Sequence, residues 1–246
     1  MPQALYDRIG GTYTSTRHPD ARIAAAIVRA LDDAKTVVNV GAGAGAYEPT
    51  DRSVVAVEPS LHMIRQRRAE AARVMQALAE ALPFRDHSFD AALALLTLHH
   101  WTDWRRGVDE MRRVANRLVV FTIEPGEVGS FWLTDAYFPE IVELDRRSPS
   151  VADLVRHVGD CRVDRIAIPH DCVDGFLAAY WRRPEAYLDP QVRAGMSAFA
   201  LLDQGVVTRG VARLKADLES GAWEERFGHI RRLEALDVCY RLLVTD

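Results

Sequence analysis

The sequence predicts an α/β fold in which a doubly wound, mostly parallel sheet carries a helical cap. Short apolar runs rich in β-branched residues alternate with helical stretches over the first half of the chain. This alternation is typical of parallel strands that are buried on both faces and joined by right-handed crossovers. In the second half, a long and mainly helical stretch, 170–234, separates the last two strand candidates. An insert of that length between two strands of one sheet should form a cap.

The expected elements begin with a helix in DARIAAAIVRAL, where Asp20 can act as the N-cap and the apolar residues share one face. Strands are expected at 36–40, 54–58, 73–75, 89–96, 118–123, 161–169 and 237–245, and further helices at 61–72, 103–115 and 151–158. Within the cap, 173–181, 189–203 and 208–221 have the apolar spacing or the boundary residues of helices, with Asp189 at one start and Gly221 at one end.

Composition and charge narrow the class of protein. A chain of 246 residues suffices for one large domain. The net charge of -4 gives no basic field for a nucleic acid backbone, so we expect no nucleic acid partner. The three cysteines lack the spacing of a zinc site or a disulfide framework, so no metal is expected. No apolar stretch reaches the roughly 20 residues of a membrane span, and the N-terminus has no signal pattern, so we expect a cytoplasmic protein that does not bind membranes.

Glycines stand at 41, 43 and 45, directly after the first strand candidate. Glycine lets the backbone turn sharply there and approach a ligand without side-chain interference. The pattern also fits the dinucleotide fingerprint of a nicotinamide or flavin enzyme, through Gly41, Gly43 and Ala46. Only AYEPTDRS separates Gly45 from the second strand, and Pro49 disfavours the long crossover helix on which a pyrophosphate rests. The spacing therefore favours another ligand.

The stretch ALAEALPFRDHSFDAALALLTLHHWTD, residues 77–103, joins the third and fourth strand candidates. It resembles the AExLPFxDxSFD signature of the class I S-adenosylmethionine-dependent methyltransferases, in their type 11-like, Rossmann-like group. VGAGAG, VVAVEPS and LTLHHW stand in the family's order around it, so the resemblance covers about residues 36–125. It implies a seven-stranded sheet with an antiparallel last strand, S-adenosyl-L-methionine as cofactor and S-adenosyl-L-homocysteine as product.

On this resemblance the chain is one methyltransferase domain, 1–246, with four parts. They are an N-terminal lid with the first helix (1–35), a cofactor-binding core (36–125), a helical segment (126–160) and the helical cap (170–234).

The resemblance also implies roles for individual residues. The glycine loop would pass under the methionine part of the cofactor, Glu58 would hold the ribose hydroxyls, and Leu95 would lie near the sulfonium. In the lid, a tyrosine would face the sulfonium and an arginine would pair with the methionine carboxylate. The implied cofactor-binding residues are Tyr13, Arg17, Gly41, Ala42, Gly43, Gly45, Glu58, Pro59, Ser60, Met63, Ala79, Glu80 and Leu95. Asn39 and Leu78 depart from the family pattern, which often has acidic residues at these positions.

Catalysis requires an aligned acceptor and, where the acceptor carries a proton, a base. His100 and His99 follow the fourth strand at the edge where ligands meet a parallel sheet, and His100 is the first choice. Further candidates are Glu124, at the end of the fifth strand on the same edge, and His170 and Asp171, at the beginning of the cap.

Aromatic residues after the fifth strand and in the cap can line an apolar chamber or pack the cap onto the sheet. The substrate-binding candidates are Trp132, Tyr137, Phe176 and Tyr180. Such a chamber predicts methyl transfer to an oxygen, nitrogen or carbon atom of a small or medium organic molecule, as in specialised metabolism. The alternatives are a noncatalytic protein that binds S-adenosylmethionine or S-adenosylhomocysteine, and a nicotinamide-dependent oxidoreductase. The sequence makes no prediction of oligomeric state.

Overall fold

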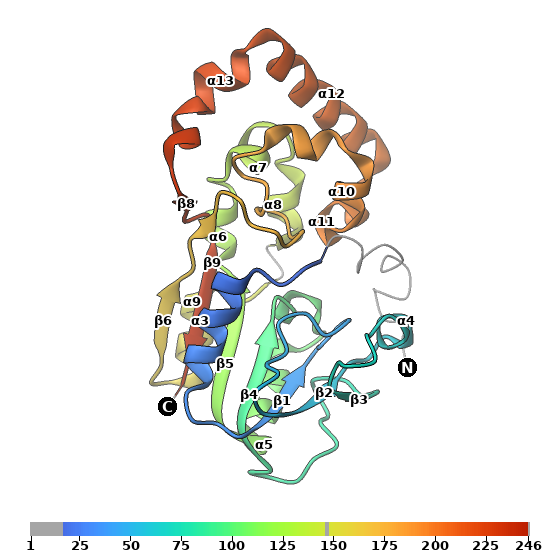
Figure 1. The fold of residues 1–246 in the computed structure, drawn as a ribbon, viewed down its shortest axis with the longest axis vertical. Helices are drawn as coiled ribbons and strands as arrows, with labels where there is room; N and C mark the ends of the chain where they lie inside the picture. The colour runs from blue at the N-terminus through green and yellow to red at the C-terminus, as the bar shows by residue number, and fades with distance from the viewer. Residues whose placement is uncertain (1–16, 146–147, 246) are drawn as a thin grey trace.

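The computed structural model describes residues 17–145 and 148–245, and places a helical lobe above the carboxyl ends of a seven-stranded sheet (Figure 1). The strands are β1 Thr36–Val40, β2 Ser53–Val57, β3 Arg73–Met75, β4 Phe89–Leu95, β5 Ala115–Ile123, β6 Arg162–Arg165 and β9 Tyr240–Val244. Their order is β3-β2-β1-β4-β5-β9-β6. β9 pairs antiparallel with both β5 and β6, and the other pairs are parallel. The predicted fold class, with its antiparallel last strand, is confirmed.

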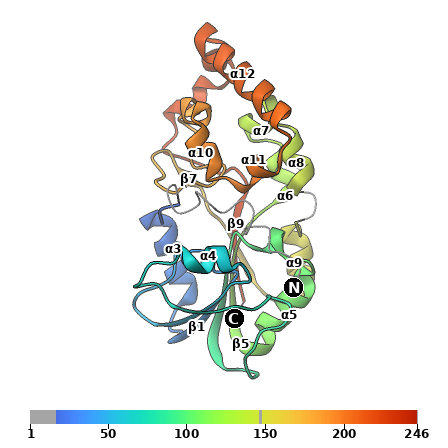
Figure 2. The same ribbon diagram turned by 90° about the vertical axis from the view of Figure 1, so that its right-hand side faces the viewer.

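Helices cover both faces of the sheet, which explains why its central strands are mainly apolar (Figure 2). α3 (Ala21–Leu31) packs on the face that includes Val37, while α5 (Trp104–Val114) and α9 (Val151–Val158) pack on the face that includes Val38. Asp20 caps α3 as predicted, since its carboxylate accepts the backbone N–H of Arg22 at 3.0 Å.

The connection from β1 to β2 forms turns, so residues 41–52 contain no helix. The next helix, α4 (Leu61–Arg65), is shorter than the predicted 61–72. Side chains bind the backbone beyond this helix: Ala72 donates its N–H to Glu48 at 3.0 Å, and its carbonyl accepts from Arg67 at 3.0 Å. Backbone groups that a longer helix would have used are therefore engaged elsewhere.

The helical lobe is built from two separate parts of the chain. The part after β5 supplies α6 (Pro125–Val128), α7 (Trp132–Ala136) and α8 (Glu140–Asp145). The later part supplies α10 (Pro190–Ala194), α11 (Ser197–Leu201), α12 (Gln204–Ser220), α13 (Ala222–Phe227) and the 3-10 helices η3 (Pro184–Leu188) and η4 (Gly228–Arg232). A two-stranded sheet of β7 (Ile168–Pro169) and β8 (Ala235–Leu236) stands at the base of this later part. α8 contacts α11, so both parts share one core.

Within the cap, the helix expected at 173–181 is wrong, because these residues form turns. Their polar groups bond over long distances, as in the indole N–H of Trp181, which donates to the carbonyl of Ile168 at 2.8 Å. The helix expected at 189–203 is divided at Gly195 into α10 and α11. The strand expected at 161–169 is likewise divided into β6 and β7. Asp189 and Gly221 do mark helix boundaries, as predicted.

Candidate active site

The glycine loop follows β1 in a left-handed conformation. Gly41, Gly43 and Gly45 have φ angles of 69°, 54° and 91°. A Cβ on Gly41 would lie 2.1 Å from Oγ1 of Thr97, which follows β4. Glycine is therefore required at position 41 both by the backbone angle and by the close approach of the next strand's end.

Glu58 follows β2 directly and is 5% exposed. Its carboxylate accepts the backbone N–H of Gly43 at 2.7 Å and the N–H of Ser60 at 2.8 Å. Ser60 is the N-cap of α4, where its hydroxyl accepts the N–H of Met63 at 3.2 Å. The methyl group of Met63 lies 3.4 Å from the position of a Cβ on Gly43. These contacts bring Glu58, Ser60, Met63 and the glycine loop together.

The structure places the other predicted cofactor residues at or near the same edge. Ala42 and Gly41 both donate to the carbonyl of Val57, at 3.0 and 2.8 Å. Pro59 accepts a side-chain bond from Gln76. Ala79 is buried, and Glu80 accepts the backbone N–H groups of Thr102 and Asp103 at the start of α5. Tyr13 lies outside the described residues.

β4 ends in a strained turn that carries the two histidines. Leu95 is the last strand residue, and Leu96 has a φ of 50°, which L side chains rarely adopt. His99 and His100 then follow in the 3-10 helix η2 (Leu98–His100), with ring centroids 3.8 Å apart. Burial, with the charge of Arg17 second, lowers the pKa of His99 to about 4. Burial, with the charge of His99 second, holds the pKa of His100 well below its usual range, so both rings are neutral at pH 7.

Arg17 forms an ion pair with Asp174 in the cap, at 2.6 Å. The structure thus brings a residue that precedes α3 together with the beginning of the cap.

Three of the four substrate-binding candidates are buried in the helical lobe or beneath it. Trp132, Tyr137 and Phe176 are 4 to 5% exposed. Trp132 packs against Trp223, with ring centroids 5.3 Å apart, and Phe176 packs against Tyr240 at 4.8 Å. The Trp132 contact joins the two parts of the helical lobe and the Phe176 contact joins the lobe to β9, and their predicted role in binding substrate is untested. Tyr180 is the partly exposed member of the set.

Among the further base candidates, Glu124 binds protein amides. Its carboxylate accepts the N–H groups of Gly126 and Val151, at 3.3 and 2.9 Å, and so joins the end of β5 to the start of α9. Asp171 is exposed and pairs with Arg22 at 2.7 Å. The exposed His170 ring contacts the carbonyl of Glu234 at 3.2 Å.

Sequence reasoning missed a buried ion pair beneath the glycine loop. The side chains of Glu48 and Arg67 are 7% and 5% exposed, and Nη2 of Arg67 lies 2.6 Å from Oε1 of Glu48. Arg67 also donates to the carbonyl of Gly43 at 3.1 Å, and Asn39 donates its amide to Glu48 at 3.2 Å. Glu48 precedes α4 and Arg67 follows it, so the two charges form no periodic pattern in the sequence. The pair is recognised only in the folded structure.

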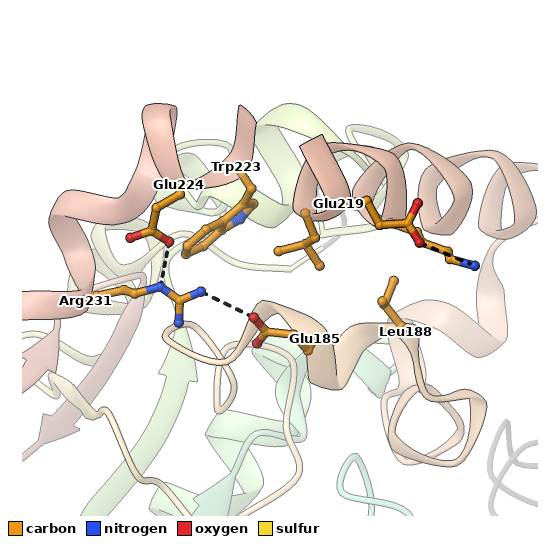
Figure 3. A pocket seen from close by; sticks show the side chains of 8 residues that line it. Glu185, Leu188, Glu219, Trp223, Glu224 and Arg231 are labelled. Carbon is orange, nitrogen blue, oxygen red and sulfur yellow. Dashed lines mark hydrogen bonds and ion pairs between the residues drawn. The ribbon is translucent and has the colours of Figure 1, made fainter. Parts of the chain in front are cut away.

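A cavity of about 310 Å³ lies in the cap, between α12, α13 and η3 (Figure 3). The charged groups at its rim are paired, since Arg231 binds Glu224 at 2.8 Å and Glu185 at 3.3 Å, and Lys215 lies 3.7 Å from Glu219. None of the residues predicted to bind cofactor or substrate lines it. The candidate active site is the carboxyl edge of the sheet, where the glycine loop, Glu58 and the two histidines lie.

The described residues form neither a metal site nor a membrane-spanning helix. Residues 17–145 and 148–245 hold no group of three or more histidine, cysteine or acidic side chains that could bind a metal ion. No helix in these ranges combines the length and apolarity that a bilayer span requires.

Comparison with known proteins decides the family. The sequence family described as "Methyltransferase domain" matches residues 38–121. A solved structure, of a protein assigned as a methyltransferase of an antibiotic biosynthesis pathway in Anabaena variabilis, is 33% identical to this chain. The match covers 94% of this chain and 99% of that one, with a TM-score of 0.88. The chain belongs to the S-adenosylmethionine-dependent methyltransferases.

S-adenosylmethionine is accordingly the cofactor of this methyltransferase, and the nicotinamide alternative is wrong. The uncharacterized methyltransferase YcgJ of Bacillus subtilis is 29% identical over 166 residues, which are 63% of this chain and 58% of YcgJ. The tRNA (carboxymethyluridine(34)-5-O)-methyltransferase ALKBH8 of Macaca fascicularis is 25% identical over 116 residues, 46% of this chain but 18% of ALKBH8. The methyltransferase thus spans little more than half of one curated relative and under a fifth of the other. The absence of a nucleic acid partner stays a prediction.

Proposed function

We propose that this methyltransferase transfers the methyl group of S-adenosylmethionine to an oxygen, nitrogen or carbon atom of a small or medium organic molecule. The observation that carries the proposal is the grouping of three neighbouring strand ends. β2 ends in the buried carboxylate of Glu58, β1 in the left-handed glycine loop and β4 in the histidine pair. Ligands of parallel α/β sheets bind at such an edge, where the strand order reverses.

The residues at this edge fit the cofactor. The two oxygens of Glu58 accept the backbone N–H groups of Gly43 and Ser60, which fixes the carboxylate at the end of β2, where it would hold the ribose hydroxyls. Asn39 supplies a second acceptor, because its Oδ1 is buried and has no hydrogen-bond partner in the described structure. The orientation of this amide is fixed, since its nitrogen faces the acceptor Glu48. A cationic donor such as the methionine ammonium would satisfy the orphaned oxygen.

The remaining cofactor residues have the roles that the family resemblance implies. Gly41, Gly43 and Gly45 would hold the methionine part, Pro59, Ser60 and Met63 one edge of the adenine, and Ala79 and Glu80 the other. Leu95 would lie near the sulfonium, and Arg17 would bind the methionine carboxylate.

When bound, S-adenosylmethionine supplies a methyl group that its sulfonium has already activated. The chain's own part is to orient the acceptor, exclude water and accept a proton where one must leave. His100 is neutral at pH 7 and can accept that proton at its unprotonated ring nitrogen. Since its pKa is low, it is a weak base, which suits acceptors that are acidic or that attack through a free lone pair.

A small or medium acceptor is supported by the helical lobe that stands over the carboxyl edge of the sheet (Figure 1). Tyr180, which is partly exposed, is the candidate of the aromatic set best able to contact an acceptor. A role in specialised metabolism is part of the same proposal.

Calorimetry of the purified protein with S-adenosylmethionine, S-adenosylhomocysteine and NADH tests the cofactor assignment. We expect the first two alone to bind, and Glu58→Gln to weaken both about tenfold or more by removing a charge-assisted pair of bonds to the ribose. Asp51→Asn, which alters an exposed carboxylate in the same β1–β2 connection, is the matched control. Unchanged binding in Glu58→Gln would contradict the ribose assignment.

Methyl transfer is then followed as release of S-adenosylhomocysteine in a panel of phenols, amines and activated carbon acids. His100→Gln should lower turnover at saturating acceptor and leave cofactor affinity unchanged. Tight cofactor binding without methyl loss to any acceptor class would support the noncatalytic alternative.

A further inference from the structure

The middle glycine of the loop, Gly43, is bound through both of its backbone polar groups. Its N–H donates to Glu58, the carboxylate proposed to hold the ribose, at 2.7 Å. Its carbonyl accepts from Nη1 of Arg67, which follows α4, at 3.1 Å. The bond to Glu58 belongs to the proposed cofactor site, whereas Arg67 has no part in the proposed chemistry. The contact between Arg67 and the loop therefore needs an explanation of its own.

Arg67 is a buried cation that one carboxylate holds in place. Its Nη2 donates to both oxygens of Glu48, at 2.6 and 2.8 Å, and to the carbonyl of Ala72 at 3.0 Å. Its Nε is buried and has no hydrogen-bond partner among the described residues. The position of the guanidinium thus depends on its two terminal nitrogens, and Glu48 supplies their charge-assisted bonds.

Glu48 is itself fixed to the sheet. Its carboxylate accepts the side-chain N–H of Asn39 at 3.2 Å and the backbone N–H of Ala72 at 3.0 Å. Asn39 lies within β1, and Ala72 directly precedes β3. A carboxylate that is bound to two strands gives Arg67, and through Arg67 the carbonyl of Gly43, a defined place relative to the sheet.

The glycine loop lies directly on this ion pair. A Cβ on Gly45 would lie 3.1 Å from Oε2 of Glu48 and 3.3 Å from Nη1 of Arg67. A side chain at position 45 would therefore push against the pair. Since Gly43 is bonded to Arg67 and Gly45 packs against both charged groups, the pair determines the shape of the loop from below.

Stability alone does not account for such a pair. Burial of two charges costs free energy that their attraction offsets only in part, so a buried ion pair commonly adds little net stability. Its effect on geometry is large, because loss of either charge leaves the other one buried without a partner. A pair of this kind is suited to fixing the position of the groups that it binds.

We propose that Arg67, held by Glu48, is a positioning residue that keeps the glycine loop in the shape that receives the methionine part of S-adenosylmethionine. The inference rests on the proposed function, in which this loop passes under the methionine part while Glu58 holds the ribose. Arg67 acts through the carbonyl of Gly43 and does not touch the cofactor. Loss of the pair should therefore weaken recognition of the amino-acid end of the cofactor far more than recognition of its adenosine.

The test compares two ligands by calorimetry: S-adenosylhomocysteine and methylthioadenosine, which keeps the adenosine and the sulfur but lacks the amino acid. Wild type should prefer S-adenosylhomocysteine by about tenfold or more, because the amino-acid end adds charge-assisted bonds. Glu48→Gln should reduce this preference about tenfold. Arg67→Lys should reduce it about threefold, because lysine offers one nitrogen where Arg67 uses two. Affinity for methylthioadenosine should change by less than about twofold in both variants.

Asp237→Asn is the matched control, since it removes a partner of another buried arginine, Arg241, whose side chain is 6% exposed. Arg241 lies in β9, which β4 and β5 separate from β1. This variant should lose stability and keep the full preference. If Glu48→Gln does not fold, Arg67→Lys decides, because it retains a positive charge beside Glu48.

The outcomes separate the inference from the proposed function. If wild type does not prefer S-adenosylhomocysteine, the proposed role of the loop is wrong and the inference is wrong with it. If wild type has the preference and both variants keep it, the proposed function stands and the inference alone is overturned. Equal weakening of both ligands would mean that the pair only supports the fold, and loss of the preference in Glu48→Gln alone would mean that Glu48 acts without Arg67. Either result also overturns the inference.

Discussion

Replacing Gly41 by alanine tests the close approach of the β1 and β4 ends. The new Cβ would meet Oγ1 of Thr97 at 2.1 Å and would hold a φ of 69°. The left-handed backbone costs an L residue about 1 to 2 kcal/mol, and an overlap within a packed site adds about 1 to 3 kcal/mol. We therefore expect Gly41→Ala to lower the free energy of unfolding by about 2 to 5 kcal/mol, measured by urea titration, and to weaken S-adenosylhomocysteine binding.

Gly221→Ala separates the two contributions. Gly221 has a φ of 83° in the left-handed region, and a Cβ there would have nothing within 4 Å, so its cost is that of the backbone angle alone. The difference between the two variants measures the overlap with Thr97. If Gly41→Ala cost no more than Gly221→Ala, the close approach would not be rigid and the argument for this glycine would be refuted.

Three further predictions follow from other contacts. Glu48→Gln should destabilise the fold by about 3 to 5 kcal/mol because it leaves the buried Arg67 without its counter-charge. Asp153→Asn, which removes the partner of the exposed Arg156, should cost under about 1 kcal/mol. Equal losses of stability in urea titration would contradict the burial argument. The pKa of His99 falls from 6.5 to about 4 on folding, so between these pH values the unfolded chain binds a proton that the folded chain does not. The free energy of unfolding should therefore fall as the pH decreases from 6.5 to 4, by up to about 3 kcal/mol. His99→Gln should flatten this part of the pH profile. Gly210→Ala should destabilise α12, because the new Cβ would lie 2.2 Å from a ring carbon of Phe138. This overlap should outweigh the gain of about 1 kcal/mol that alanine brings to a helix. A raised midpoint of thermal unfolding would show that the ring moves aside freely.

The sheet could be predicted from the sequence because each of its strands carries its own signal. TVVNV, SVVAV and FDAALAL are apolar on both faces, and such runs become strands wherever they are buried between helices. The caps at Asp20 and Asp189 were predictable for a similar reason, since each bonds to an N–H two residues along the chain. Strands and caps that depend on residues close together in the sequence can be predicted before the fold is known.

Elements that depend on distant partners could not be predicted in this way. The segment 173–181 has helical spacing, yet Trp181 and its neighbours bond to the sheet side and the chain forms turns. Trp132, Tyr137 and Phe176 were sound aromatic candidates, but periodicity does not say whether an aromatic residue faces a ligand or another ring. In the same way, Asp174 carries no motif, and its importance comes from four donors that three segments bring to it.

The short β1–β2 connection explains why two adjacent residues have such strong partners. Without a crossover helix, the glycine loop has no regular hydrogen-bonded element to hold it in the described structure. Tyr47 instead fixes the loop to the cap through Asp174, and Glu48 fixes it to the segment after α4 through Arg67. The loop that is proposed to hold the cofactor is therefore held from both sides by buried charged groups. Its shape should respond to changes in the cap, which is the part of the molecule proposed to recognise the acceptor.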